Sequence, residues 1–234
     1  MGLQKQDDLK QKAAHRAVEA IESGMIVGLG TGSTTSFAVI RIAERIKAGS
    51  LADIVGIPTS IRTEKLAREL GIPLATLEEQ PEINVTIDGA DEVDPDLNLI
   101  KGGGGALLRE KVVAQASRTN IIIVDESKLS DCLGTHWALP VEVIPFAAKT
   151  ETNFLQSLGA TVSMRRDKEG QPYKTDQHNY ILDANFGPMS DPAALAHRLN
   201  RRAGIIEHGL FLGLAGEVIV AAEEGIRHLH RKNK

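Results

Sequence analysis

A stretch of 23 residues between Asp88 and Glu110 constrains this chain more than any other part of its sequence. It reads DGADEVDPDLNLIKGGGGALLRE and contains six acids, one lysine and four consecutive glycines. The alternation of Ile83, Val85 and Ile87 before it predicts a β-strand, so the first acids should lie at the carboxyl end of that strand. Ligands of open α/β sheets bind at this edge. The stretch therefore predicts an α/β sheet with a polar site at its carboxyl edge.

The four glycines, Gly102 to Gly105, indicate a loop whose main chain is approached closely by a ligand. Glycine costs backbone entropy inside a helix or strand, and a flexible linker would not lie so near both a strand and a helix. The segment from Ala106 to about Ala116 has a helical pattern, and its free amides and positive dipole end would point at the same place. Glu110 lies in the first turns of this helix and can point back toward the glycine loop.

A second glycine-rich loop follows the first predicted strand, Met25 to Leu29. The segment GTGST, residues 30–34, runs from this strand directly into a helix. Backbone amides and hydroxyls in this arrangement can hold a phosphate. The glycine spacing differs from the dinucleotide pattern GxGxxG, and the sequence has no GxxxxGK[ST] motif. A single phosphomonoester is therefore the ligand that the loop favours.

Lys128 follows another predicted strand, Ile121 to Val124. Because the carboxyl ends of parallel strands share one edge of a sheet, Lys128 should lie at the same edge as Asp88 and Ser33. An exposed lysine carries little information by itself. Its place in the chain makes Lys128 a candidate ligand for the phosphate.

The sequence pattern changes after about Leu133. Strands are predicted at 139–144, 160–164 and 180–184, and helices at 150–158 and from 192 to about 199. This β-α-β-β-α order is α+β and ferredoxin-like in outline. Aliphatic segments at 209–213 and 218–220 then show the same strand pattern as the first half of the chain.

We therefore predict the fold class α/β: a Rossmann-like open, mostly parallel sheet domain with a smaller α+β (ferredoxin-like) domain inserted before the C-terminal return. The catalytic α/β domain should comprise residues 1–133 and 208–234. The small domain should comprise residues 134–207, and we expect it to be involved in oligomerisation. The basic segment from Arg227 to Lys234 is interpreted as a charged helix end and a frayed tail.

Composition limits the partners of this chain. A net charge of -4 and a pI near 6.0 provide no basic field for nucleic acid. The sequence has one cysteine, Cys132, no recognisable signal peptide and no apolar run of about 18 residues, so we expect a cytoplasmic protein without membrane contact. The seven histidines show no spacing typical of metal ligands, and we expect neither a metal nor a cofactor.

Taken together, the motifs resemble those of the A-type ribose-5-phosphate isomerase family. They are GTGST at 30–34, DGADE at 88–92, IKGGGGALLREK at 100–111 and ESK at 126–128, in that family's order and spacing. The similarity continues through LPVEVIPFA at 139–147, GATVSMR at 159–165 and GLFLGLAGEVIV at 209–220. The DGAD and KGGG blocks at their mutual spacing are the most specific part of the resemblance.

The resemblance implies an aldose–ketose isomerase that interconverts D-ribose 5-phosphate and D-ribulose 5-phosphate through an enediolate, in the non-oxidative branch of the pentose phosphate pathway. It implies that Glu110 is the general base and that Asp88, Asp91 and Lys101 surround the reacting end of the sugar. It further implies that Thr31, Gly32, Ser33, Thr34 and Lys128 hold the substrate, chiefly its phosphate. The other implied substrate-binding residues are Gly89, Ala90, Gly102, Gly103 and Gly104. We expect a homodimer or homotetramer.

The residue types fit this chemistry. Moving one proton between adjacent carbons requires one base that takes and returns it, and Glu110 can be that base. Charge that develops on the substrate oxygens requires fixed donors, which Lys101 and the glycine amides can supply. Asp88 and Asp91 can accept hydrogen bonds from sugar hydroxyls or assist ring opening, and the sequence does not divide these tasks between them.

Two other classes of protein stay open at this point. A sugar-phosphate-sensing domain of a transcriptional regulator would keep the pocket and lack the chemistry, but it should carry a DNA-binding helical module, and the N-terminus here is one helix long. Acyl transfer of the CoA-transferase type uses a related fold and a catalytic glutamate. The pairing of the DGAD and KGGG blocks argues against the latter.

Overall fold

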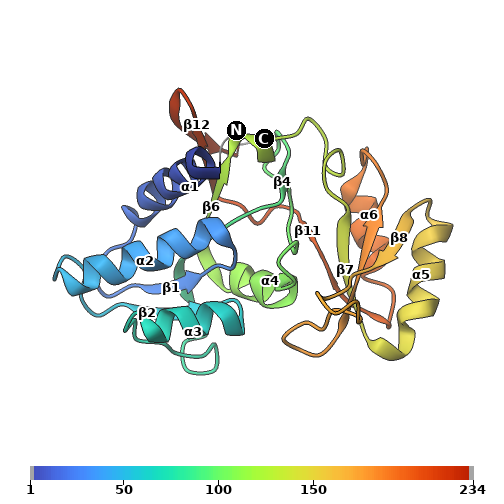
Figure 1. Cartoon of the computed structure of the whole chain (residues 1–234), viewed down its shortest axis with the longest axis horizontal. Coiled ribbons are helices and arrows are strands. Elements are labelled where there is room, and N and C mark those ends of the chain that lie inside the picture. Colours follow the sequence, from blue (N-terminus) through green and yellow to red (C-terminus); the bar gives the residue numbers. More distant parts are fainter. Residues whose placement is uncertain (1–2, 232–234) are drawn as a thin grey trace. The chain divides into compact units, whose positions relative to one another are not determined.

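The computed structural model describes residues 3–231, which form two compact units (Figure 1). The first unit consists of Met1–Ala90, Arg109–Lys128 and Leu214–Lys234, and the second of Asp91–Leu108 and Leu129–Gly213. The chain therefore leaves the first unit twice and returns to it twice.

A six-stranded sheet forms the centre of the first unit. Its strands are β1 (Ile26–Leu29), β2 (Val55–Pro58), β3 (Ile83–Asp88), β6 (Ser117–Asp125), β12 (Glu217–Ala222) and β13 (Gly225–His230). They lie in the order β13-β12-β6-β3-β1-β2, with β13 antiparallel to β12 and all other neighbours parallel. The five parallel strands therefore present their carboxyl ends at one edge of the sheet and their amino ends at the other.

Four helices accompany this sheet: α1 (Leu3–Val18), α2 (Ser33–Lys47), α3 (Ile61–Glu69) and α4 (Leu107–Gln115), whose first two residues belong to the second unit. The main core joins α1 and α2 to alternate strand residues such as Val27, Leu29 and Ile123. A smaller cluster packs Val113 of α4 against the sheet. A side chain at Gly28 would lie 1.8 Å from Thr86 Oγ1 and 2.9 Å from Val113 Cγ1, so glycine is required where α4 approaches β1 closely.

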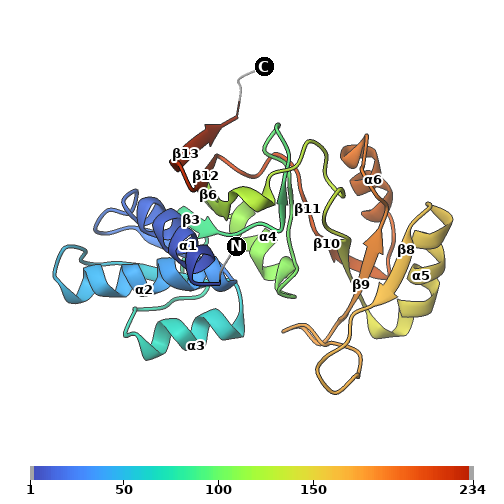
Figure 2. The ribbon, with the colours of Figure 1, turned by 45° about the horizontal axis from the view of Figure 1, so that its top comes forward.

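The second unit contains an antiparallel sheet with two helices (Figure 2). Its elements are β7 (Leu139–Val143), α5 (Ala148–Ser157), β8 (Thr161–Met164), β9 (Tyr180–Asn185), α6 (Pro192–Leu199) and β10 (Ile205–His208). The strand order β10-β7-β9-β8 gives the ferredoxin-like arrangement. Leu155 of α5 and Leu199 of α6 are fully buried in one core with the strands. The Asp191 side chain caps α6 by accepting a hydrogen bond from the Ala194 amide.

A three-stranded sheet completes the second unit. It consists of β4 (Glu92–Val93), β5 (Leu99–Ile100) and β11 (Leu210–Phe211), in the order β11-β5-β4. The short helices η1 (Glu126–Lys128) and η2 (Pro145–Ala147) follow β6 and β7. None of the helices within residues 3–231 combines the length and apolar character that crossing a membrane requires.

The predicted fold class is confirmed, with an α/β sheet unit and a ferredoxin-like unit. The compact units differ from the predicted domains mainly at residues 91–108, which belong to the second unit because β4 and β5 pair with β11. For the same reason the segment 209–213 extends the second unit and does not resume the first.

Two local predictions are wrong. The segment from Arg227 is a strand, not a helix end, because pairing with β12 supplies its backbone hydrogen bonds and an edge strand tolerates charged side chains. The predicted tail at 232–234 lies outside the described residues. The sequence also predicts a short strand around Leu74 to Leu77, but the structure has only an isolated bridge between Leu74 and Gly56 there.

Candidate active site

The loop after β1 is held by Asp88, the last residue of β3. The amides of Thr31 and Gly89 both donate to Asp88 Oδ1, at 3.1 and 2.8 Å. Asp88 is only 3% exposed, and a side chain at Gly30 would lie 2.3 Å from the same oxygen. The glycine therefore lets a buried carboxylate join two loops at the carboxyl edge of the sheet.

A cluster of buried hydroxyls fixes the other side of this loop. Thr31 Oγ1 lies 2.8 Å from Thr59 Oγ1, 2.7 Å from Ser60 Oγ and 3.1 Å from Thr63 Oγ1. The Thr63 hydroxyl in turn donates to the Gly30 carbonyl at 3.0 Å. The hydroxyl of Thr31, predicted as a substrate contact, thus ties the loop to the start of α3.

The first turn of α2 has the features of an anion site. Its N-cap is Gly32, which adopts a φ of 140° and has no side chain to cap the helix amides. Ser33 is exposed and Thr34 is half-buried at this end. The hydroxyls of Thr35 and Ser36 turn inward and donate to the Gly32 carbonyl, at 3.0 and 2.9 Å. The positive end of the helix dipole and the first amides can therefore receive a phosphate.

Lys128 ends η1, the short helix that follows β6. The side chain of Asp125 shapes this turn, because it accepts hydrogen bonds from the amide and the hydroxyl of Ser127. Lys128 is half-buried. Since β6 is parallel to β3 and β3 to β1, Lys128 lies at the same edge as Asp88 and the loop 30–34.

Glu110 lies in the first turn of α4 and is 4% exposed. The Ser117 hydroxyl secures the other end of this helix, since it donates to the Val113 carbonyl at 2.6 Å and lies 2.6 Å from Thr86 Oγ1. With the close approach at Gly28, these contacts hold the helix that carries Glu110 firmly on the sheet. A carboxylate on such a helix is positioned more precisely than one on a loop.

The predicted site residues Asp91, Lys101 and Gly102 to Gly104 belong to the second unit, whereas Ala90 ends the first segment of the first unit. The Gly103 amide donates to Asp91 Oδ2 at 2.7 Å. A side chain at Gly103 would lie 2.6 Å from Asp91 Oδ1, and Gly102 and Gly105 have φ angles of 102° and 81°. Lys101 is 3% exposed, with its ammonium 5.4 Å from the centroid of the Phe211 ring. Asp91 and the glycine loop thus form one hydrogen-bonded arrangement.

Arg165 supports this loop and was missed as a site residue. Its Nη1 donates to the carbonyls of Gly102 and Gly103, at 2.8 and 3.1 Å, and its guanidinium also pairs with Asp183. The residue ends the GATVSMR segment, which was the only sequence signal for it. It orients the loop amides by holding the carbonyls of the same peptides.

Two of the six acids in the opening stretch are structural. Glu92 is fully buried and accepts hydrogen bonds from the amides of four consecutive residues, Gly134, Thr135, His136 and Trp137. Asp94 Oδ1 accepts from the amides of Asp96 and Asn98 and forms a turn.

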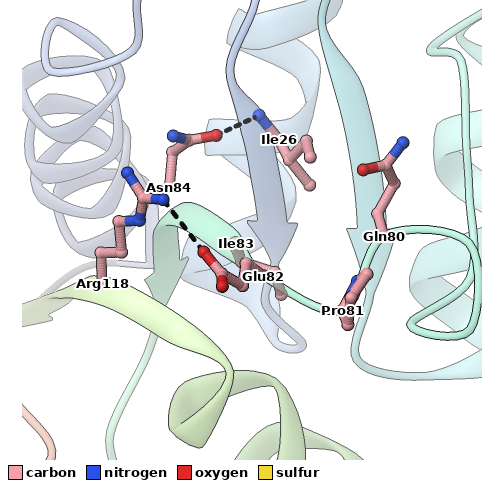
Figure 3. Close-up of a pocket in the computed structure, with 7 residues that line it drawn as sticks. All are labelled: Ile26, Gln80, Pro81, Glu82, Ile83, Asn84 and Arg118. Carbon is pink, nitrogen blue, oxygen red and sulfur yellow. Dashed lines mark hydrogen bonds and ion pairs between the residues drawn. The ribbon is translucent and has the colours of Figure 1, made fainter.

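A pocket at the opposite edge of the large sheet contrasts with this region (Figure 3). It is lined by Ile26, Gln80, Pro81, Glu82, Ile83, Asn84 and Arg118, at the amino ends of β1, β3 and β6. Arg118 Nη2 lies 2.9 Å from Glu82 Oε2, and Asn84 Oδ1 accepts from the Ile26 amide at 2.8 Å. The ion pair neutralises its own charge, so this pocket is unsuited to a phosphate.

Comparisons with known proteins identify the relatives of this chain. The family model for ribose 5-phosphate isomerase A (phosphoriboisomerase A) matches residues 55–225. The chain is 64% identical over 224 residues to ribose-5-phosphate isomerase A of Desulfatibacillum aliphaticivorans, covering 96% of this chain and 97% of that protein.

Two solved structures are also similar. A D-ribose-5-phosphate isomerase in complex with phospho-erythronic acid has a TM-score of 0.95 and 42% identity, and the match covers 99% of this chain and 100% of the other. The ribose 5-phosphate isomerase of Plasmodium falciparum has a TM-score of 0.94 and 42% identity, with coverage of 97% and 100%. The family resemblance of the motifs is confirmed: the chain belongs to the ribose 5-phosphate isomerase A family.

Proposed function

We propose that this chain interconverts D-ribose 5-phosphate and D-ribulose 5-phosphate in the non-oxidative branch of the pentose phosphate pathway. Full-length similarity to isomerases of this name supports the reaction. The observation that carries it is the carboxyl edge of the first unit, where an uncapped helix N-terminus, Lys128 and buried Asp88 follow neighbouring parallel strands. This edge therefore brings groups that can bind a phosphate close to a carboxylate that can bind sugar hydroxyls.

In the proposed mechanism Glu110 moves one proton. Its carboxylate takes the proton from C2 of the open-chain aldose, and the bonding electrons form the C1–C2 double bond of an enediolate. Glu110 then returns the proton to C1, while a proton passes from O2 to O1 and a carbonyl forms at C2. The net change is an aldehyde converted to a ketone without an external oxidant or reductant.

Fixed donors stabilise the enediolate in this proposal. Lys101 and the amides of the loop Gly102–Gly104 carry positive charge or polar hydrogens that suit the developing oxyanion. Support for a preformed loop comes from Arg165 and Asp91, which bind its carbonyls and one of its amides. Asp88 and Asp91 bind sugar hydroxyls or assist ring opening.

The phosphate is assigned to the loop at residues 31–34 and to Lys128. Ser33 is exposed at the start of α2, and the dipole of this helix of 15 residues favours an anion there. Lys128 adds a full positive charge from a different loop at the same edge.

We also propose a cytoplasmic homodimer or homotetramer whose interface includes the second unit. Phe146 supports this assembly, because its side chain is 98% exposed and Ile206 in the same unit is 40% exposed. Sedimentation of the Phe146→Ser variant tests it: a lower mass than wild type is expected, and an unchanged mass would argue against this interface.

One assay tests the proposed reaction. The purified chain should convert ribose 5-phosphate to ribulose 5-phosphate, should act poorly on ribose, and should keep its turnover after exhaustive chelation, since Lys101 and the loop amides supply the charge stabilisation. Phospho-erythronic acid should inhibit competitively, because its carboxylate resembles the two oxygens of the enediolate. Absence of isomerisation with intact inhibitor binding would favour a sugar-phosphate sensor, and activity restored by a divalent ion would contradict the metal-free mechanism.

A further inference from the structure

A second polar cluster lies on the hairpin of β12 and β13, at the other end of the large sheet from the proposed active site. Glu217 is the first residue of β12 and lies opposite His230 in the strand register. His228 precedes His230 by two residues in β13, so both rings lie on the face that carries Glu217. The hairpin therefore gathers two imidazoles and a carboxylate on one surface.

The ligand atoms of this cluster are close together. His228 Nδ1 hydrogen-bonds to Glu217 Oε1, and His230 Nε2 lies 3.9 Å from the same oxygen. One nitrogen or oxygen from each residue lies within 4.8 Å of the other two. Ligand atoms bound to a tetrahedral zinc ion at about 2.1 Å lie about 3.4 Å apart. The site therefore forms when the hydrogen-bonded atoms of His228 and Glu217 separate slightly and the exposed His230 ring turns toward them.

We propose that Glu217, His228 and His230 bind one divalent transition-metal ion of the zinc class, with water completing the coordination. Two imidazoles and a carboxylate suit zinc, whereas magnesium and calcium prefer oxygen ligands alone. Arg16 Nε donates to His228 Nε2 at 3.1 Å, which assigns the ring proton to Nδ1. When the metal binds Nδ1, the neutral ring carries its one proton at Nε2 instead.

Arg16 competes with the metal. Once the metal occupies Nδ1 of His228, Nε2 must carry the ring proton and can no longer accept from Arg16. The guanidinium of Arg16 already pairs with Glu19 and is half-exposed, so it can turn toward Glu19. Replacing Arg16 with methionine should therefore tighten metal binding.

The expected consequence is structural and not catalytic. The ion would join the edge strand β13 to β12, and α1 contacts β12 beside it. Glu217 starts its strand, whereas Asp88 is the last residue of β3 and Lys128 follows the carboxyl end of β6. Zinc should accordingly raise the thermal stability of the protein and leave its turnover unchanged.

Titration of the full chain with zinc chloride, followed by calorimetry, tests the site. The decisive variant is His230→Gln, because this side chain is 66% exposed and its loss should not disturb folding. The matched control is His197→Gln, an exposed histidine in α6 of the second unit. We expect one tight site per chain, weakened at least about tenfold by His230→Gln and unaffected by His197→Gln.

Melting temperature provides a second readout. Zinc should raise Tm in the wild type and in His197→Gln, and the rise should be lost in His230→Gln and in Glu217→Gln. Equal zinc affinity in His230→Gln and His197→Gln, or an equal rise in Tm, would overturn the proposal and assign the binding to scattered histidines.

Discussion

The two ends of the large sheet differ in how their charged groups are held. At the carboxyl end, Asp88 is bound by backbone amides, and Lys128 follows a turn that Asp125 shapes. At the amino end, Arg118 pairs with Glu82 in the pocket of Figure 3. Charges fixed by the backbone can act on a ligand, whereas charges that pair with each other are already neutralised. This difference favours the carboxyl end of the sheet for the proposed chemistry.

The largest effect is expected at Glu110. Glu110→Gln preserves the shape of the side chain and removes its basicity, so kcat for ribose 5-phosphate should fall about 10²–10⁴-fold with KM little changed. Glu82→Gln, at the amino end, is the matched control and should leave kcat unchanged. Steady-state kinetics of both variants measures this difference in kcat. If kcat falls equally in Glu110→Gln and Glu82→Gln, the two ends of the large sheet do not differ in function.

The second effect concerns the phosphate. Lys128→Ala removes a charge-assisted contact worth roughly 1.5 to 3 kcal/mol, which corresponds to about tenfold to a hundredfold in affinity. Arg118→Ala should have no such effect. The informative quantity is the preference for ribose 5-phosphate over ribose. If wild type and Lys128→Ala show the same preference, Lys128 does not bind the phosphate.

The third effect tests the packing of the loop at the carboxyl end. Gly30→Ala would place its Cβ 2.3 Å from Asp88 Oδ1, and we expect it to destabilise the fold by about 1–3 kcal/mol. Gly216→Ala, beside the start of β12, has its nearest neighbour at 3.5 Å and should be tolerated. Thermal unfolding of both variants measures the difference. A Gly30→Ala protein as stable as Gly216→Ala would show that the loop is not held as described.

The smallest expected effect is on stability and comes from Glu142, a buried carboxylate outside both ends of the large sheet. Glu142 in the second unit is fully buried, and its Oε1 accepts from Thr175 and Asn179, whereas its Oε2 has no hydrogen-bond partner among the described residues. Burial raises the pKa of Glu142 above its ordinary 4.5, with Glu207 and Asp176 adding to the rise.

The sign of the pH effect follows from this raised pKa. The contribution of protonated Glu142 to stability is fully present below its unfolded pKa of 4.5 and is lost as the pH rises through the higher folded pKa. Glu142→Gln keeps both hydrogen bonds to the side-chain oxygen and should be the more stable protein near neutral pH by about 1 kcal/mol. The melting temperatures of wild type and Glu142→Gln, measured from about pH 4.5 to neutral pH, test this difference in stability. If the stability of Glu142→Gln relative to wild type does not increase with pH, the pKa of Glu142 is not raised in the folded protein.

The sequence predicts the carboxyl end of the sheet well because its signals are local. Asp88, Ser33 and Lys128 each follow a buried strand within a few residues, and parallel pairing alone brings them to one edge. Glu110 was predicted as the base from the family resemblance and from its place on a helix.

The rest of the molecule depends on pairing that the sequence does not display. Arg165 reaches carbonyls of residues more than 60 positions away. Glu217 and His230 meet only because β13 is a strand, and the charged C-terminal segment was interpreted as a helix end. The hydroxyls around Thr31 come from Thr59 and Ser60, directly before α3, and from Thr63 in its first turn. These groups are brought together by strand register and helix docking.

The transfer of a proton by Glu110 is tested most directly by isotope exchange in deuterated water. Wild type should incorporate solvent deuterium at C2 of the aldose or C1 of the ketose during turnover. Glu110→Gln should lose this exchange together with turnover while it still binds phospho-erythronic acid. If the variant exchanges the proton at a rate near that of wild type, the base is another residue, and Asp88 and Asp91 become the candidates.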